Sequence, residues 1–468
     1  MIQSLYKIYL EHPVVTTDSR QCPEGSLFFA LRGERFDGNQ YAAEVLKKGC
    51  VLAVVDNADV IPVPVSDYGQ YGSYFYVPDV LTALQQLAAC HRDAFRTWQR
   101  PVPVIGITGT NGKTTTKELT LAVLSQKYNV LATQGNLNNQ IGVPLTLLKV
   151  RQEHELAIIE MGANHPMDIA DLCAIARPDF GLITNVGKAH LMGFGSLDGV
   201  VSAKTKLYES LRADNGKVFV DLGNQHLVPK AEGMDVVGYG IDGGDVSGLT
   251  VSGRMLSCSP YLSIQLNVAD EASSVEINTH LIGNYNLINV IAAATVGHEF
   301  GVTTESIKSA IEGYEPQNMR SQLVDLGYDN YLILDAYNAN PTSMTAAILS
   351  FAQNTAAHKN LILGDMRELG AESAAEHSRI LELLASDDMK FDSVLLVGTE
   401  FTTAFRAADD RTVSTIARNT TRCYADVAAL CQDEQMLHNI AGTTLIKGSR
   451  GIQLEKAAEA IKSYYCQS

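Results

Sequence analysis

The segment 104–117, VIGITGTNGKTTTK, constrains the fold of this chain more than any other stretch, because an apolar run gives way there to glycines, a lysine and three threonines. The apolar run suits a buried β-strand, and Gly109 and Gly112 allow a tight turn whose N–H groups face an anion. Lys113 adds positive charge, and the hydroxyl of Thr114 follows it, as in loops that bind nucleotide phosphates and Mg²⁺. The segment therefore predicts a phosphate-binding loop between a strand and a helix.

The glycine spacing departs from the general phosphate-loop pattern GxxxxGK[ST], which requires a glycine where this chain has Ile107. An ordinary turn between a strand and a helix is the alternative. The order of strand, glycines, lysine–threonine pair and a helix expected over 118–128 favours the phosphate loop. The candidate nucleotide-binding residues of this loop are Gly109, Thr110, Asn111, Gly112, Lys113, Thr114 and Thr115.

The length of 468 residues predicts about three domains, at roughly 150 residues each. The proline-bearing segment 99–103 and the segment 314–320 are candidate boundaries between them. The expected domains are therefore 1–100, 101–315 and 316–468.

From residue 104 onward, strand-like runs alternate with helical patterns, which predicts a parallel sheet whose ligands gather at the carboxyl ends of its strands. Residues 215–280 are turn-rich and strand-like, and we expect an antiparallel addition there. The last third repeats the alternation without phosphate-loop glycines, so it predicts a second, Rossmann-like open sheet that closes over the first site. The expected fold class is α/β, with helices on both faces of the central sheet and a small α/β domain at the N-terminus.

The net charge of −16 and the pI near 5.1 argue against a nucleic-acid partner, because binding to a phosphate backbone requires basic surface. The first residues, MIQSLYKIYLEHP, lack the charged and apolar regions of a leader, and no apolar run approaches about 20 residues. We therefore expect a cytoplasmic protein without membrane insertion. The eight cysteines include no CxxC pair, which predicts free thiols.

Two further side chains follow predicted strands on the same sheet edge as Thr114. Glu160 lies near the end of the strand at 155–162, and His190 follows the strand at 179–186. Mg²⁺ prefers oxygen ligands, so Glu160 and Thr114 are candidate ligands of Mg²⁺. A single histidine in such a place is more often structural, but three candidate ligands on one edge favour a role for His190 at a second metal position.

Several other polar residues allow two interpretations. Lys204 lies on a helical pattern, where spacing alone favours a surface lysine. Asn286 and Asn289 are three residues apart and share one helical face, so they either hydrogen-bond a purine edge or cap the helix. The segment 335–341, DAYNANP, follows a strand and offers polar groups to a ligand.

In the first domain, loops beside strands carry Ser19, Arg20, Arg32 and Asp37. Their hydroxyl, guanidinium and carboxylate groups suit a ribose, a base or a diphosphate. Polar turns are common, however, so spacing alone favours solvated turn charges.

Together these segments resemble the Mur ligases of peptidoglycan synthesis, a family of three-domain, ATP-dependent enzymes that form amide bonds. The resemblance covers nearly the whole chain, and the short glycine spacing TGTNGKTT is a feature of that family. Its further motifs here are GNLNNQIGVP (135–144), NVGKAHL (185–191), DAYNANP (335–341), LGDMRELG (363–370) and KGSR (447–450). These motifs are similar to those of the member that adds D-alanyl-D-alanine to UDP-N-acetylmuramoyl-tripeptide, and the DNPR motif of the sister enzyme that adds the third residue is absent.

The resemblance implies that the tripeptide carboxylate takes the γ-phosphoryl group of ATP and that the dipeptide amine then displaces phosphate. The catalytic residues that it implies are Lys113, Glu160, His190 and Lys204. Thr114 and Glu160 would hold one Mg²⁺, and His190 would serve a second metal position with Lys204, whose counterpart in the family is carbamylated. One departure is Lys206, which stands where the family commonly has glutamate in the pattern AKxE and so removes a carboxylate near the carbamate.

The resemblance also assigns binding residues. It implies nucleotide contacts from Asn286, Asn289, Arg320 and Asp335. It places the uridine nucleotide at Ser19, Arg20, Arg32 and Asp37, further substrate contacts at Asn138 and Asn139, and the dipeptide at Asn338 and Asn340. A monomer is expected. The alternatives are another Mur-type or folylpolyglutamate-type amide ligase, and a P-loop kinase or nucleotide-driven binding protein that forms no amide bond.

Overall fold

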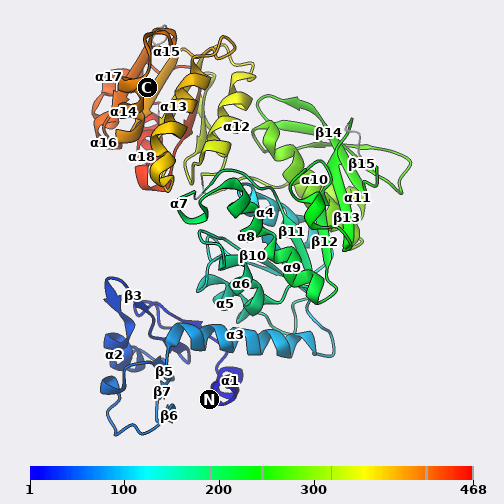
Figure 1. Ribbon diagram of the computed structural model, residues 1–468, viewed down its shortest axis with the longest axis vertical. Coiled ribbons are helices and arrows are strands. Elements are labelled where there is room, and N and C mark those ends of the chain that lie inside the picture. The colour runs from blue at the N-terminus through cyan, green and yellow to red at the C-terminus, as the bar shows by residue number, and fades with distance from the viewer. Residues whose placement is uncertain (190, 244–246, 318, 417–419, 466–468) are drawn as a thin grey trace.

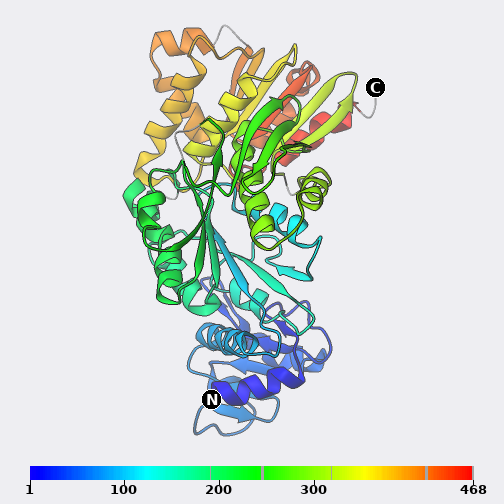
Figure 2. The same cartoon turned by 90° about the vertical axis from the view of Figure 1, so that its right-hand side faces the viewer.

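The computed structural model shows three sheet-containing parts that follow one another along the long axis of the molecule (Figure 1). The chain begins in the part at the bottom of the view and ends in the part at the top, and the view turned by 90° shows the same succession (Figure 2). The structure describes residues 1–189, 191–243, 247–317, 319–416 and 420–465.

The N-terminal part is a five-stranded sheet in the order β1-β2-β5-β7-β6, in which only the β6–β7 pair is antiparallel. Its strands are β1 Val15–Thr16, β2 Leu27–Phe29, β5 Leu52–Val55, β6 Gly69–Tyr71 and β7 Tyr74–Tyr76, and β3 Arg32–Gly33 forms a separate hairpin with β4 Phe36–Asp37. Its helices are α1 Ile2–Glu11, α2 Ala42–Lys47 and α3 Val80–Arg96. Helix α3 begins where the side chain of Asp79 accepts a hydrogen bond from the backbone N–H of Thr82, which is a typical N-cap.

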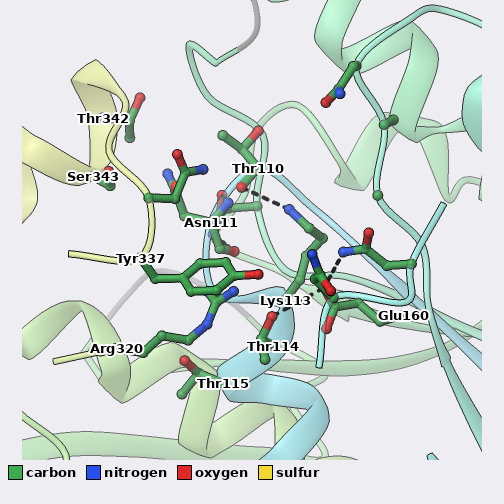
Figure 3. Close-up of a pocket in the computed structure, with 18 of the residues that line it drawn as sticks. Thr110, Asn111, Lys113, Thr114, Thr115, Glu160, Arg320, Tyr337, Thr342 and Ser343 are labelled. Atoms are coloured by element: carbon green, nitrogen blue, oxygen red, sulfur yellow. Dashed lines mark hydrogen bonds between the residues drawn. The ribbon is translucent and has the colours of Figure 1, made fainter. Parts of the chain in front are cut away.

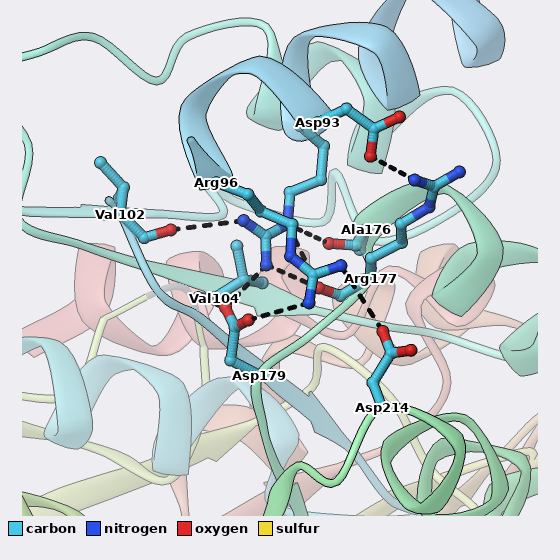
Figure 4. Close-up of polar contacts among 9 residues, drawn as sticks. Asp93, Arg96, Val102, Val104, Ala176, Arg177, Asp179 and Asp214 are labelled. Carbon is cyan, nitrogen blue, oxygen red and sulfur yellow. Dashed lines mark hydrogen bonds and ion pairs between the residues drawn. The ribbon is translucent and has the colours of Figure 1, made fainter. Parts of the chain in front are cut away.

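Helix α3 is joined to the central sheet by Arg92, a fully buried arginine. Figure 4 labels its partners Ala176, Arg177 and Asp179. Its guanidinium donates to the carbonyl oxygens of Ala176 at 2.8 Å and Arg177 at 2.7 Å, and to Asp179 Oδ2 at 2.6 Å. Asp179 also accepts from the backbone N–H of Val104 at 2.7 Å. Burial lowers the pKa of Arg92 to about 10, so the side chain is still charged at neutral pH. One buried cation thus ties α3 to the starts of two central strands.

The central part is a nine-stranded sheet in the order β16-β15-β14-β13-β12-β11-β8-β10-β9. Its strands are β8 Val104–Thr108, β9 Val130–Ala132, β10 Leu156–Glu160, β11 Phe180–Ile183, β12 Lys217–Asp221, β13 Asp235–Ile241, β14 Val251–Cys258, β15 Leu262–Val268 and β16 Val275–Asn278. The expectation of an antiparallel addition over 215–280 is only partly right. Strands β12, β13 and β14 continue the parallel pairing, and only β14–β15 and β15–β16 are antiparallel.

Helices cover both faces of the central sheet because its buried strands carry apolar side chains on both sides. Ala157 and Ile159 of β10 pack in the same core as α5 Gly142–Leu147, α6 Asp168–Ala176, α8 Leu197–Lys204 and α9 Lys206–Ala213. Ile158, between them, packs in the opposite core with α4 Lys113–Leu124, α10 Leu287–Glu299 and α11 Thr304–Glu312. The short helix α7 Leu191–Phe194 precedes α8.

The C-terminal part is a six-stranded sheet in the order β17-β18-β22-β19-β20-β21, parallel except for β17–β18. Its strands are β17 Gln322–Gly327, β18 Asn330–Asp335, β19 Lys359–Gly364, β20 Ser393–Val397, β21 Thr420–Tyr424 and β22 Thr443–Lys447. Its helices are α12 Pro341–Ala352, α13 Ser373–Leu384, α14 Thr399–Ala407, α15 Asp410–Ile416, α16 Val427–Gln432, α17 Glu434–His438 and α18 Glu455–Tyr465. The expected α/β class is confirmed. The two edge strands β17 and β21 come in addition to the four strands expected in this part of the chain.

One local prediction is wrong. The helix after the glycine-rich loop begins at Lys113 and ends at Leu124, whereas the sequence pattern suggested 118–128. Gly112, with φ of +76°, is its N-cap, so the threonines of the motif form its first turn rather than a loop. Among the described residues, no helix combines the length and apolar character needed to cross a membrane.

Candidate active site

A cavity of about 840 Å³ lies between the central and C-terminal sheets. Figure 3 shows Lys113, Thr114 and Glu160 on the central side facing Arg320 and Tyr337. The central part contributes the glycine-rich loop, the loop 136–141, residues after β10 and β11, and the start of α10. The C-terminal part contributes residues at the ends of β18 and β22 and the first turn of α12. The carboxyl ends of parallel strands in both sheets thus line one cavity, which is where α/β proteins bind ligands.

Two glycines of the loop stand where no other residue fits. Gly109 has φ of +150°, and a Cβ there would lie 1.9 Å from Thr184 Oγ1. A Cβ on Gly112 would lie 2.6 Å from Asn289 Oδ1. The turn therefore requires glycine both for its backbone conformation and for close packing.

The loop is also held from the end of β11. Asn185 Oδ1 accepts from the backbone N–H of Asn111 at 3.0 Å, and Asn185 Nδ2 donates to the Asn111 carbonyl at 2.9 Å. Thr184 Oγ1 donates to the same carbonyl at 2.6 Å. Asn185 opens the quoted motif NVGKAHL but was not among the candidate site residues, because its partner lies 74 residues earlier in the chain.

Lys113 points into the loop. Its Nζ donates to the carbonyl oxygens of Gly109 at 2.8 Å and Thr110 at 3.1 Å. Burial lowers the pKa of Lys113 to about 8, while the charge of Glu160 raises it and that of Arg320 lowers it further. A phosphate group in the loop would favour the charged form of this lysine.

Thr114 and Glu160, predicted to meet at one sheet edge, are in contact. Thr114 Oγ1 donates to Glu160 Oε1 at 3.2 Å, and Asn138 Nδ2 donates to the same oxygen at 2.8 Å. Glu160 is 1% exposed, and its Oε2 has no hydrogen-bond partner among the residues that the structure describes. A buried carboxylate oxygen without a partner beside a hydroxyl fits Mg²⁺, which binds one or two carboxylates together with substrate phosphates. Within the described ranges, no group of three histidine, cysteine, aspartate or glutamate side chains gathers as a metal site.

The two remaining candidates for the metal site have different outcomes. His190 lies outside the described residues. Lys204 is 2% exposed, so the alternative of a surface lysine is wrong. Its Nζ lies 6.0 Å from the centre of the Phe194 ring, and burial, with the nearby charge of Lys113, lowers its pKa well below the ordinary value. Lys206 pairs with Glu209 at 2.7 Å on the next helix.

Asn286 and Asn289 are buried and line the cavity. Asn289 Nδ2 donates to Asn286 Oδ1 at 2.9 Å, and Thr116 Oγ1 donates to Asn289 Oδ1 at 3.2 Å. The Asn286 amide donates to the carbonyl of Ile282 at 2.8 Å and makes no cap bond to α10, so the capping alternative is wrong. Asn289 instead packs against Gly112 of the loop.

Arg320 and Asp335 line the cavity from the C-terminal side. The Arg320 guanidinium lies 4.1 Å from the centre of the Tyr337 ring, which orients it across the cavity. Asp335 Oδ2 accepts from Lys447 Nζ at 2.6 Å. Lys447 also lines the cavity, although it was not a predicted site residue.

The asparagines predicted to bind substrate are placed differently. Asn138, Asn139 and Asn338 line the cavity. Asn340 does not line it, because its Oδ1 caps α12 by accepting from the Ser343 N–H at 2.9 Å. Its Nδ2 donates to Asn111 Oδ1 at 2.8 Å, so it joins the two parts of the molecule directly.

The four candidate residues of the N-terminal part contact other residues of that part. Arg20 pairs with Asp18 at 2.8 Å, and Arg32 pairs with Asp56 at 2.9 Å and with Asp37 at 3.6 Å. Ser19 accepts from Lys48 Nζ through its carbonyl at 3.0 Å. Ser19, Arg20, Arg32 and Asp37 are all described, and none of them lines the cavity. A uridine-nucleotide site at these residues stays a prediction.

Three domain models match the chain: "Mur ligase family, catalytic domain" over 13–92, "Mur ligase middle domain" over 107–297, and "Mur ligase, glutamate ligase domain" over 319–450. The UDP-N-acetylmuramoyl-tripeptide–D-alanyl-D-alanine ligase of Escherichia coli K12 is 34% identical over 456 residues, which cover 96% of this chain and 93% of the relative. The chain belongs to the Mur ligase family.

Other members of the Mur ligase family are similar to this chain over most of its length. The enzyme of the same name from Bacillus subtilis 168 is 32% identical and covers 94% of this chain and 91% of the relative. A crystal structure of MurF from Acinetobacter baumannii superposes with a TM-score of 0.81 at 30% identity, covering 96% of this chain and 93% of that one. The MurF ligase of Thermotoga maritima in complex with ADP shares the fold, with a TM-score of 0.79 at 24% identity over 98% of this chain and 99% of that one.

Proposed function

We propose that this Mur ligase joins D-alanyl-D-alanine to UDP-N-acetylmuramoyl-tripeptide, using ATP, to give the pentapeptide precursor of peptidoglycan. The names of its full-length relatives support this activity. The observation that carries the proposal is the single cavity in which the glycine-rich loop, the partnerless oxygen of Glu160 and the DAYNANP segment meet. A kinase-like or nucleotide-driven binding protein would leave the last of these without a role.

Thr114 and Glu160 would hold Mg²⁺, because they offer a hydroxyl and a buried carboxylate at one point of the cavity. When bound, Mg²⁺ neutralises charge on the phosphates of ATP. The loop N–H groups and Lys113 would bind the phosphates from the other side, and the positive end of the α4 dipole points at the same place. These residues supply positioning and charge rather than covalent chemistry.

The reaction follows from the poor reactivity of a carboxylate toward amines. An oxygen of the tripeptide's terminal carboxylate attacks the γ-phosphorus of ATP, the bond to the β-phosphate oxygen breaks, and ADP leaves with that electron pair. The dipeptide's neutral amine then attacks the carbonyl carbon of the acyl phosphate. The carbon–oxygen bond to phosphate breaks, the amine proton is lost to solvent or a base, and the amide forms. Lys113 opposes the negative charge that moves during the first transfer.

An acyl phosphate must be protected from water, and the cavity walls provide a means. Arg320, Tyr337 and Asn338 of the C-terminal part face the glycine-rich loop across the cavity. The hydrogen bond between Asn340 and Asn111 holds the two walls together. We assign Asn338 to the dipeptide side of the cavity and Asn340 to its closure.

We further propose that Lys204 carries a carbamate and serves a second metal position with His190. Only a neutral amine reacts with CO₂, and burial lowers the pKa of Lys204 toward that form. The resulting carbamate would supply an anionic oxygen group at position 204, beside Lys206, which stands where the family commonly has glutamate. Lys204→Ala should lose activity and regain part of it with added short-chain carboxylates; full activity without them would contradict the role.

The proposed function is tested by acceptor choice. The purified protein is incubated with ATP, Mg²⁺ and UDP-muramoyl-tripeptides bearing lysine or diaminopimelate, and then with either D-alanyl-D-alanine or single amino acids. The expected product, detected by mass, is a pentapeptide formed from the dipeptide alone. A product formed from a single amino acid would assign the chain to another step of the same family.

A further inference from the structure

Three segments that resemble family motifs meet at the carboxyl ends of β18, β19 and β22. Lys447 of β22 is the direct register partner of Asp335 on β18, although 112 residues separate them. Ser449 Oγ donates to the carbonyl of Ala339 at 3.3 Å and accepts from the N–H of Arg367 at 2.9 Å. The KGSR segment therefore contacts both DAYNANP and LGDMRELG.

Lys447 is unusual for its place in the sheet. Strand β22 lies inside the six-stranded sheet, between β18 and β19, and all five of its residues are buried. Lysine is rarely buried without a specific partner, because its charge is costly to remove from water. Lys447 is 2% exposed, yet it lines the cavity beside Asp335.

Its ammonium contacts both ends of one short segment. Nζ donates to Asp335 Oδ2 at 2.6 Å and to the carbonyl oxygen of Asn338 at 3.4 Å. Both residues line the cavity, and the proposed function assigns Asp335 to the nucleotide and Asn338 to the dipeptide. The side chain of Asn338 is itself oriented by accepting from the N–H of Ala339 at 2.9 Å.

We propose that Lys447 is a positioning residue that fixes the segment 335–338 between the nucleotide and the dipeptide. It orients the Asp335 carboxylate toward the nucleotide and anchors the main chain that carries Asn338. The part of this role that concerns the dipeptide rests on the proposed function. The part that concerns nucleotide binding, called here the nucleotide arm, does not depend on which reaction the protein catalyses. Lys447 acts through its two partners and does not take part in bond making.

The nucleotide arm is tested by titrating Mg²⁺-ADP into the full-length protein and measuring heat. Lys447→Met is expected to weaken ADP binding about tenfold, because it removes the ammonium group that holds the Asp335 carboxylate in its orientation. In an Asp335→Asn background the same change should add nothing, since residues acting through one contact are not additive. Unchanged ADP binding in Lys447→Met, or a further loss in the double variant, would overturn the proposal.

Two further variants keep the result interpretable. Arg422→Met breaks a different cation–carboxylate pair, in which Arg422 of β21 contacts Asp433. Neither residue lines the cavity, so this variant should leave ADP binding unchanged. If Lys447→Met fails to fold, Lys447→Gln replaces it, because glutamine keeps a hydrogen-bond donor but has a shorter side chain without charge. Lys447→Gln is also expected to weaken ADP binding, and unchanged binding would overturn the proposal.

The dipeptide arm is tested by steady-state kinetics. Lys447→Met should raise KM for D-alanyl-D-alanine as well as for ATP, whereas Asp335→Asn should raise KM for ATP alone. A fall in kcat with both KM values unchanged would contradict a positioning role. Failure of the wild-type protein to form pentapeptide would instead refute the proposed function, and the ADP titrations would still decide the nucleotide arm.

Discussion

The buried histidine of α3 should make the stability of this protein depend on pH. His91 is 3% exposed, and its ring contacts Tyr9, Phe95 and Trp98 at centroid distances of 5.1, 5.5 and 5.9 Å. Nε2 lies 3.0 Å from the carbonyl of Val150 and can only donate to it, so in the neutral ring Nδ1 accepts from the Tyr6 hydroxyl at 3.2 Å. Protonation would abolish that acceptor.

The magnitude follows from the pKa of His91, which burial lowers to about 4 from an ordinary value of 6.5. Because the folded state binds the proton more weakly than the unfolded chain, stability is complete above about pH 7.5 and falls as the pH decreases toward 4. The free energy of unfolding should fall by about 2 kcal/mol between about pH 7.5 and pH 5, and by about 3 kcal/mol in full.

The assay is urea unfolding followed by the fluorescence of Trp98, the sole tryptophan of the chain, which contacts His91. His91→Gln is the matched variant, because its amide can donate to Val150 and accept from Tyr6 without titrating. The unfolding free energy of the wild type minus that of His91→Gln should fall by about 2 kcal/mol as the pH is lowered from about 7.5 to about 5. Equal pH dependence of the two proteins would refute the argument that His91 is neutral in the folded state.

Three further changes have defined outcomes. Arg92→Met leaves Asp179 without its buried partner and should destabilise the junction of α3 with the central sheet by about 3–5 kcal/mol, seen as faster amide exchange in α3; unchanged exchange would contradict it. Glu160→Gln should lower kcat at least about 100-fold while the melting temperature is kept, since it removes the proposed Mg²⁺ ligand, and retained Mg²⁺-dependent turnover would be the contrary result. Asn340→Ser keeps a side chain that can cap α12 but loses the donor to Asn111, so kcat/KM should fall about fivefold. In an Asn111→Ala background the same change should lower kcat/KM by less. Equal falls in both backgrounds would show that the contact between Asn340 and Asn111 does not contribute to activity.

The part of the site nearest to the glycine-rich loop could be predicted because its signals are local. A strand, two glycines and a lysine–threonine pair specify the loop within fourteen residues. Thr114 and Glu160 could be expected to meet because both follow parallel strands, and β8 and β10 are indeed neighbours, with Ile107 beside Glu160 in register. Both ends of the helix were misplaced by four or five residues, because threonine is a weak helix former and the cap at Gly112 was not recognised.

The rest depends on pairings that no local pattern encodes. Lys447 and Asp335 come together because β22 lies between β18 and β19, an order that the sequence does not state. Lys204 is the last residue of α8, and α9 begins at Lys206, so the segment that looked like one helix consists of two short helices. The burial of Lys204 could not be expected from that pattern. Asn340 contacts the glycine-rich loop across 229 residues, and its role as a cap is visible only from the hydrogen bonds of α12.

The most direct test of the account is phosphate release from Mg²⁺-ATP in the presence of UDP-muramoyl-tripeptide, measured with and without D-alanyl-D-alanine while the nucleotide product is weighed by mass spectrometry. The account predicts release that requires both substrates and one pentapeptide formed for each phosphate. Release that is indifferent to the dipeptide, with no new amide in the product, would contradict it and show that this cavity hydrolyses ATP without joining the two substrates.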